Sequence, residues 1–241
     1  MRLYMALYTL GLVAAFFLVV VARRVINKEK LPSFGLQINS HGLRSLAKGI
    51  LIGIIIVALY IALSLIWGRA RFQMNGGTLS ATLFYSFMGL CYCAMVALLE
   101  ETIYRGYAFP VLRRKVNIYV ATILPSLVFA GMHFQMYSSS KYVVLGLFNA
   151  FVLAIAFTFL ARRTETIMIG IGIHLVWNYW QIMLFSNVLF QEPTWINLVI
   201  TSNLLTGSSN NAPESGLIFS LLVTLLVAYS LLVKQKEKRS A

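Results

Sequence analysis

Seven long apolar stretches divide this chain, and they constrain its fold more than any other feature. A helix that crosses the hydrocarbon core of a bilayer needs about 20 apolar residues. Only 11% of the residues are charged, whereas a soluble domain carries roughly a quarter. The sequence therefore predicts one integral membrane domain over residues 1–241, an all-α bundle of transmembrane helices. The stretches lie at residues 3–22, 50–67, 81–99, 118–136, 142–161, 166–185 and 216–233.

The segment between the last two stretches is predicted to lie on the outer side of the membrane. Residues 186–215 contain Pro193, Pro213 and a run of turn-forming residues at 207–211. Its middle, from Trp195 to Leu205, is apolar enough for a short or re-entrant helix. The predicted helix count is therefore seven or eight.

The basic residues predict the orientation of the bundle. Sixteen of the 20 Lys and Arg residues fall in segments 23–48, 102–116, 162–165 and 234–241. Cytoplasmic loops carry such an excess, so the N-terminus is predicted to lie outside and the C-terminus in the cytoplasm. A net charge of +13 in so apolar a chain indicates topology and contact with membrane lipids rather than with nucleic acid.

Two glycines in the second stretch predict a close helix contact. Gly49 and Gly53 are four residues apart and therefore share a helix face. Small residues at this spacing let a neighbouring helix approach closely in a membrane. Local flexibility of the apolar run is the alternative interpretation.

A few strongly polar side chains stand inside the apolar stretches, where each costs about 2.5–3.5 kcal/mol to insert. Glu101 and Arg105 are i, i+4 neighbours that can form an ion pair, whereas Glu100 points about 100° away on the helix. A solvated helix end would also explain this group. If the third helix continues to about Pro110, however, Glu100 lies in the middle of the membrane.

The second and third groups contain two of the three histidines. Phe129 and His133 share a helix face, although a lone histidine there is also compatible with a hydrogen-bonded packing residue. His174 and Asn178 share another face, and two stacked polar groups in an apolar helix need a polar partner or a wet cavity. His41 lies in a polar loop and is assigned no role.

In order along the chain, these groups read Glu-Glu-x-x-x-Arg, Phe-x-x-x-His and His-x-x-x-Asn. This arrangement resembles the CAAX prenyl endopeptidase and bacteriocin-processing family of intramembrane proteases, also called Abi proteins, over about residues 80–185. The resemblance implies a conical or cleft-like cavity among the helices and a hydrolase that cuts a membrane-associated or lipidated peptide or protein.

The resemblance also implies roles for the motif residues. Glu100 and His133 would activate the attacking water. His174 and Asn178 would hydrogen-bond the developing oxyanion, where fixed donors are most effective. Glu101 and Arg105 would hold the catalytic residues in place.

Whether a metal takes part stays open at this point. Glu100, His133 and His174 form a ligand set that catalytic zinc uses, as in a metalloprotease. Zinc would leave only Glu101 as general base, and the chain has no His-Glu-x-x-His motif. A water activated by glutamate without any cofactor is the simpler mechanism.

Other functions remain as alternatives to a protease. A non-catalytic immunity or regulatory scaffold would keep the fold without turnover, and a proton-coupled transporter would use Glu and His as a relay. Aspartate-pair proteases are excluded because the chain has no Asp, and no Gly-x-Ser-Gly supports serine chemistry. A bacterial plasma membrane is the expected location.

Overall fold

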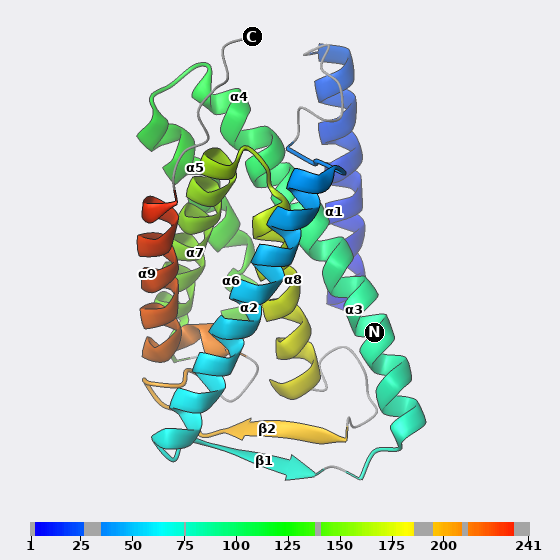
Figure 1. Ribbon diagram of the computed structural model, residues 1–241, viewed down its shortest axis with the longest axis vertical. Helices are drawn as coiled ribbons and strands as arrows, with labels where there is room; N and C mark the ends of the chain where they lie inside the picture. Colours follow the sequence, from blue (N-terminus) through cyan, green and yellow to red (C-terminus); the bar gives the residue numbers. More distant parts are fainter. Residues whose placement is uncertain are drawn as a thin grey trace.

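The computed structural model describes residues 3–26, 35–74, 76–137, 141–185, 195–208 and 212–233. They form a helical bundle with a two-stranded sheet across one end (Figure 1). The helices and strands are α1 (Leu3–Val21), α2 (Ser40–Ile66), β1 (Ala70–Met74), α3 (Leu79–Glu101), α4 (Phe109–Arg113), α5 (Ile118–Met132), α6 (Phe134–Tyr137), α7 (Val143–Thr164), α8 (Met168–Trp180), β2 (Ile196–Ile200) and α9 (Leu217–Leu232). Shorter turns are η1 (Ala22–Ile26), η3 (Thr102–Ala108), η4 (Gln181–Phe185) and η5 (Pro213–Ser215).

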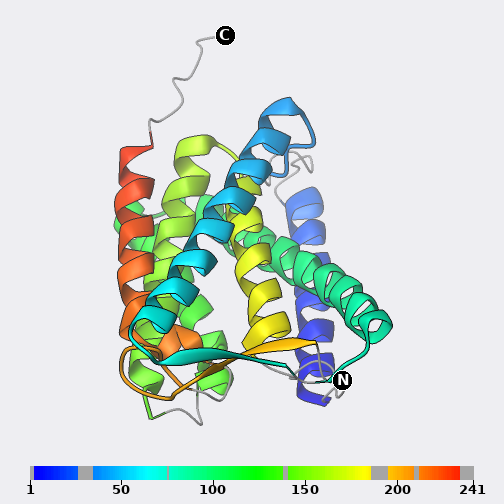
Figure 2. The ribbon, with the colours of Figure 1, turned by 60° about the horizontal axis from the view of Figure 1, so that its bottom comes forward.

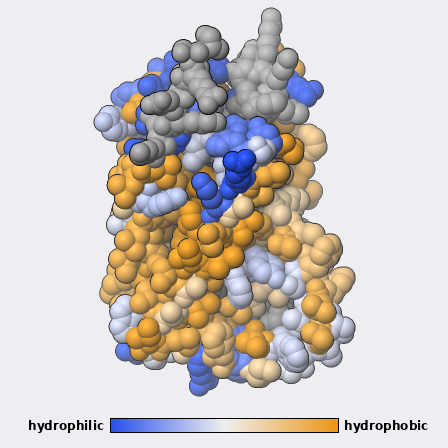
Figure 3. Space-filling view, in the orientation of Figure 1, coloured by the Kyte–Doolittle hydropathy of each residue, from blue (hydrophilic) through white to orange (hydrophobic). Residues whose placement is uncertain are grey.

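The surface of the bundle identifies an integral membrane protein. Three helical segments are long and apolar enough to cross a bilayer, namely Ser40–Ile66, Leu79–Arg113 and Val143–Thr164. Two shorter apolar helices are Ile118–Met132 and Leu217–Leu232. Figure 3 shows a broad hydrophobic band between more hydrophilic ends. Large apolar side chains such as Phe87 (64% exposed) lie on the surface of the bundle, where contact with lipid chains is favourable and contact with water is not.

The third apolar stretch continues well past the two glutamates, as the sequence analysis required. α3, η3 and α4 form one helical segment of 35 residues, Leu79–Arg113. The backbone becomes π-helical in η3, where the Phe109 amide donates to Tyr104 O. Such π-turns occur frequently at functional sites. Glu100 and Glu101 therefore lie inside a long helix rather than at its end.

α8 lies in the middle of the bundle and packs most extensively against α2. A Cβ atom added to Gly49 would lie 2.2 Å from Ile169 O, and one added to Gly53 would lie 2.8 Å from the Val176 side chain. On α8, a Cβ atom at Gly172 would lie 2.6 Å from Leu46 O. The predicted close approach at the glycine pair is therefore confirmed.

Gly49→Ala is expected to destabilise the protein because the new methyl group would press on a backbone carbonyl that cannot move aside. Overpacking of this kind costs roughly 1–3 kcal/mol or more. Thermal unfolding in detergent measures the effect. Gly11→Ala is the control, since a Cβ atom there meets nothing within 4 Å. Equal melting temperatures for the two variants would contradict the predicted contact.

The segment predicted as a short or re-entrant helix forms a strand instead. β2 pairs antiparallel with β1, from Ala70 opposite Ile200 to Met74 opposite Ile196. The sequence Ile-Asn-Leu-Val-Ile is rich in β-branched residues, which favour a strand. The side chains of Leu198 and Ile200 are buried. The all-α prediction is therefore corrected to a helical bundle with one two-stranded sheet, which crosses the end of the bundle in Figure 2.

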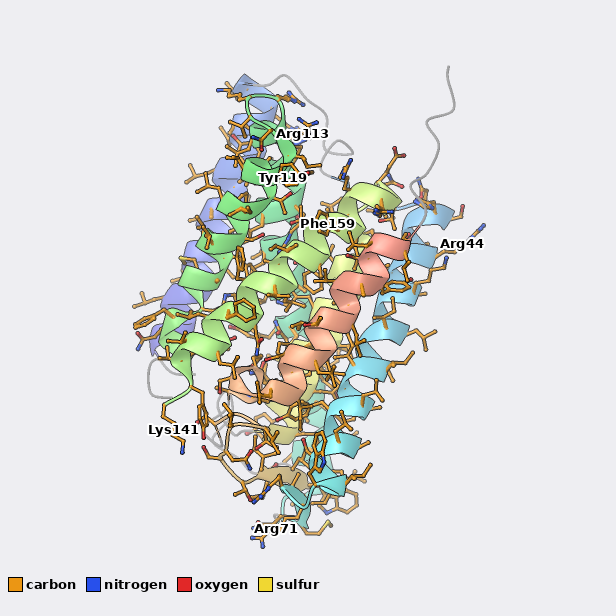
Figure 4. The ribbon with its side chains drawn as sticks, turned by 90° about the vertical axis from the view of Figure 1, so that its left-hand side faces the viewer. Arg44, Arg71, Arg113, Tyr119, Lys141 and Phe159 are labelled. Atoms are coloured by element: carbon orange, nitrogen blue, oxygen red, sulfur yellow. The ribbon has the colours of Figure 1, made fainter. Side chains whose placement is uncertain are left out.

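The two ends of the bundle differ in the basic residues they carry. Arg44 and Arg113 lie at one end, and Arg71 and Lys141 lie at the end that carries the sheet (Figure 4). The first pair belongs to segments predicted to be cytoplasmic, and the second pair to loops predicted to lie outside. This separation along the bundle is the arrangement that the predicted orientation requires.

Candidate functional site

Two adjacent carboxylates at the end of α3 form the centre of the candidate site. Glu100 and Glu101 are 1% and 0% exposed. Arg105, one helical turn later, donates from Nη1 to Glu101 Oε1 over 2.8 Å and from Nη2 to Ala154 O over 3.1 Å. The predicted Glu101–Arg105 ion pair is confirmed, and it is buried, where losing either partner is costly.

Aromatic rings enclose the guanidinium of Arg105. Its Cζ atom lies 4.7 Å from the centre of the Phe129 ring, 5.3 Å from that of Phe157 and 5.8 Å from that of Tyr104. A cation within about 6 Å of a ring face is attracted by the ring quadrupole. Because Phe129 belongs to α5 and Phe157 to α7, Arg105 connects the glutamate helix to both.

His174 lies between the two carboxylates. Its Nδ1 atom donates to Glu101 Oε1 over 3.3 Å, and its Nε2 atom lies 3.7 Å from Glu100 Oε2. α8 reaches the glutamates closely because of Gly170, where a Cβ atom would lie 2.9 Å from Glu101 Oε2. The polar partner predicted for His174 is therefore the pair Glu100 and Glu101.

His133 ends α5 and contacts the site through an aromatic ring. Its Nδ1 atom hydrogen-bonds Phe129 O over 2.8 Å, and because that carbonyl only accepts, Nδ1 carries the proton. The imidazole stacks on the Phe129 ring with centroids 4.4 Å apart, and the same ring lies 6.2 Å from the His174 ring. Phe129 thus lies between the two histidines, and in the neutral imidazole His133 Nε2 is available as an acceptor.

Asn178 lies one turn beyond His174 on α8 and is half-buried. Within the described parts of the chain, no hydrogen bond joins its side chain to the glutamates or histidines. The structure therefore connects Glu100, Glu101, Arg105 and His174 by polar contacts, adds His133 through Phe129, and leaves Asn178 at the edge of the group.

The proposed zinc ligands do not assemble into a metal site. Among the described residues, no three His, Cys, Asp or Glu side chains are placed to share an ion. His174 directs both ring nitrogens at carboxylates, and among the described residues no contact brings His133 Nε2 to Glu100 or His174. The geometry therefore does not fit Glu100, His133 and His174 as a zinc-binding set.

A further buried carboxyl was missed by the sequence analysis. Glu214, in η5 just before α9, is 6% exposed, and its Oε1 atom accepts a hydrogen bond from Trp177 Nε1 over 2.8 Å. Burial raises the pKa of Glu214 to about 7, against the opposing effect of that hydrogen bond. The residue lies in the segment 186–215, predicted to lie on the outer side of the membrane, and its sequence context of Pro, Ser and Gly gives no signal of burial.

Comparison with known proteins adds one result. Residues 82–180 match the family model described as Type II CAAX prenyl endopeptidase Rce1-like. The matched segment contains all three polar groups of the site, from Glu100 to Asn178. No curated protein and no solved structure gives a significant match to the chain.

Proposed function

Since residues 82–180 belong to the Rce1-like type II CAAX prenyl endopeptidase family, we propose that this membrane protein is an intramembrane endopeptidase. It hydrolyses a peptide bond in a membrane-associated or lipidated peptide or protein. The observation that carries the proposal is the convergence of two buried carboxylates and an imidazole within 3.7 Å, from α3 and α8. Burying these groups is costly, and a reaction that needs them explains their presence.

Glu100 is the proposed general base. Glu101 Oε1 already accepts hydrogen bonds from both Arg105 and His174, so Glu101 and Arg105 act as supporting residues. Glu100 is the carboxylate that faces His174 Nε2. It removes a proton from the attacking water, and general-base catalysis of this kind contributes about 10²–10⁴-fold.

The remaining motif residues receive the roles that the family implies. His133 orients the water together with Glu100, through its unprotonated Nε2 atom. His174 and Asn178 hydrogen-bond the oxyanion that forms on the scissile carbonyl, as fixed donors in a site that excludes bulk water. Because Nδ1 donates to Glu101, the donor to the oxyanion is Nε2, and the ring must carry a proton on both nitrogens when the oxyanion forms.

A metal-independent reaction is expected, and chelation tests it. The purified protein should cleave a farnesylated peptide ending in Cys-aliphatic-aliphatic-X at the same rate with and without 1,10-phenanthroline. Elemental analysis should find far less than one zinc per chain. Loss of cleavage in the chelator, restored by added zinc, would overturn the glutamate-only mechanism. Comparing the farnesylated peptide with its unmodified counterpart shows whether the lipid is recognised.

The proposed location is a bacterial plasma membrane, with the N-terminus outside and the C-terminus in the cytoplasm. Reporter fusions after the C-terminus and within the loop between β1 and α3 test this orientation. A cytoplasmic signal from the loop fusion would reverse it.

A further inference from the structure

Among the described residues, Glu214 has the one buried carboxyl that has no part in the proposed reaction, and this carboxyl contacts α8. η5 carries it into the bundle from the end that bears the sheet. Asn149 Nδ2 on α7 donates to Glu214 O over 2.6 Å and to Gly216 O over 3.3 Å. The backbone around the carboxyl is therefore anchored to a membrane helix.

The partner of this carboxyl belongs to the helix of the site. Trp177 follows His174 by three residues on α8 and directly precedes Asn178. Its ring packs on Phe219 of α9 with centroids 4.5 Å apart, and edge-on against Tyr60 of α2 at 5.8 Å. Because the indole packs against Phe219 and Tyr60 and donates from Nε1, a rotation of α8 would break the hydrogen bond to Glu214.

Hydrogen bonds also hold the backbone near Glu214. Tyr60 Oη donates to Thr206 O over 2.7 Å, and Ser215 Oγ donates to Ala212 O over 2.7 Å. At the other end of α8, Gly172 lies directly against the backbone of α2. α8 is thus held against α2 by glycine contacts at Gly172 and Gly53, and near its end also by the hydrogen bond between Trp177 and Glu214.

We propose that Glu214 is a positioning residue for the site: by binding Trp177 Nε1, it fixes the rotation of α8 that places His174 between Glu100 and Glu101. The effect on cleavage rests on the proposed function, whereas the effect on His174 does not. Glu214→Gln keeps an oxygen that accepts the hydrogen bond from the indole, so it should preserve the position of His174. Glu214→Ala has no such oxygen and should not preserve it.

Four variants test this role: Glu214→Gln, Glu214→Ala, Trp177→Phe and, as a matched control, Glu165→Gln at an exposed helix end. The chain has only three histidines, so ¹⁵N-histidine NMR in detergent micelles reports on His174 directly, with its signal assigned by loss in His174→Gln. At pH 6, Glu214→Ala and Trp177→Phe should shift the His174 ring signals, and Glu214→Gln and Glu165→Gln should not.

Cleavage of the farnesylated peptide provides the second measurement. Misplacing a reacting group by about 1 Å costs on the order of 10²-fold, so kcat should fall by about 10–100-fold in Glu214→Ala, with KM within about threefold. Glu214→Gln should stay within about threefold of wild type in kcat. Partial loss of folded protein would also lower the apparent kcat at unchanged KM, so each kcat is normalised to the amount of folded protein.

The outcomes separate the two proposals. Wild-type His174 signals in both Glu214→Ala and Trp177→Phe would overturn the positioning role, whether or not the peptide is cleaved. If the variants shift the His174 signals but the wild-type protein cleaves neither the farnesylated nor the unmodified peptide, the positioning role is supported and the proposed protease is overturned. If Glu214→Ala does not fold, Trp177→Phe decides the question, because it removes the donor and keeps an aromatic ring.

The protonation of Glu214 predicts how stability depends on pH. The groups that interact with the carboxyl are Trp177, Gln181 of η4, Tyr137 of α6 and Tyr60 of α2. Its pKa of about 7 in the folded protein exceeds the ordinary value of 4.5, so the folded state binds the proton more tightly. The stability supplied by the neutral carboxyl is therefore complete below about pH 4.5 and is lost as pH rises to about 7.

Melting temperatures in detergent should show this loss. Between pH 5 and pH 7.5 the wild-type melting temperature should fall more steeply than that of Glu214→Gln, which has no proton to lose there. Glu165→Gln should follow wild type. Parallel curves for wild type and Glu214→Gln would contradict a carboxyl that is neutral in the folded state.

Discussion

Glu100→Gln is expected to abolish peptide cleavage and to leave the fold intact, with kcat falling by about 10³-fold. The amide has almost the same shape as the carboxylate but cannot accept a proton from water. We do not expect Glu101 to replace it, because the positive charge of Arg105 at 2.8 Å and the His174 hydrogen bond at 3.3 Å make the Glu101 carboxylate a weaker base. Cleavage of the farnesylated peptide by purified protein in detergent measures the loss.

Two controls make this result specific. Glu165→Gln removes an exposed carboxylate and should cleave at the wild-type rate. The melting temperature of Glu100→Gln should equal or exceed that of wild type, since a buried charge has been removed. Wild-type cleavage by Glu100→Gln would exclude Glu100 as the general base and favour the scaffold or transporter alternatives.

Arg105→Met is expected to have the largest effect on stability. It leaves the Glu101 carboxylate, which is 0% exposed, without a cation at its Oε1 atom. Removing one partner of a buried ion pair costs about 3–5 kcal/mol. The loss includes the contacts of the guanidinium with the Phe129 and Phe157 rings. Unfolding followed by circular dichroism in detergent measures the change.

A second variant separates the charge from the packing. Arg105→Met combined with Glu101→Gln removes both charges, so it should recover part of the stability lost in the single variant. Arg113→Met at the exposed end of α4 is the control and should change stability little. A single Arg105→Met variant as stable as the control would show that the buried pair contributes nothing.

The sequence was most informative where single residues violate the apolar pattern. Glu101 and Arg105 pair as their i, i+4 spacing predicts. Gly49 and Gly53 mark the close contact of α2 with α8. The continuation of the third helix past Glu100 followed from the need to place the polar groups at one depth, and α3, η3 and α4 confirm it.

Other features depend on contacts between segments that are distant in the chain. β1 and β2 are separated by more than 100 residues and form a sheet only because each supplies the other's hydrogen bonds. The apolar residues of Ile196–Ile200 are compatible with either helix or strand until that partner is known. The burial of Glu214 likewise depends on Trp177 and Asn149, which belong to two other helices.

The sequence alone determined that this chain enters a membrane and which few polar side chains must gather there, because apolar length and the cost of an isolated polar group are local properties. Only the tertiary structure decided that His174 lies between the two glutamates, that Phe129 lies between His133 and His174, and that the Glu214 carboxyl binds the same helix as His174. The physical reason is that distances between helices are set by side-chain packing across them, which no single apolar stretch encodes.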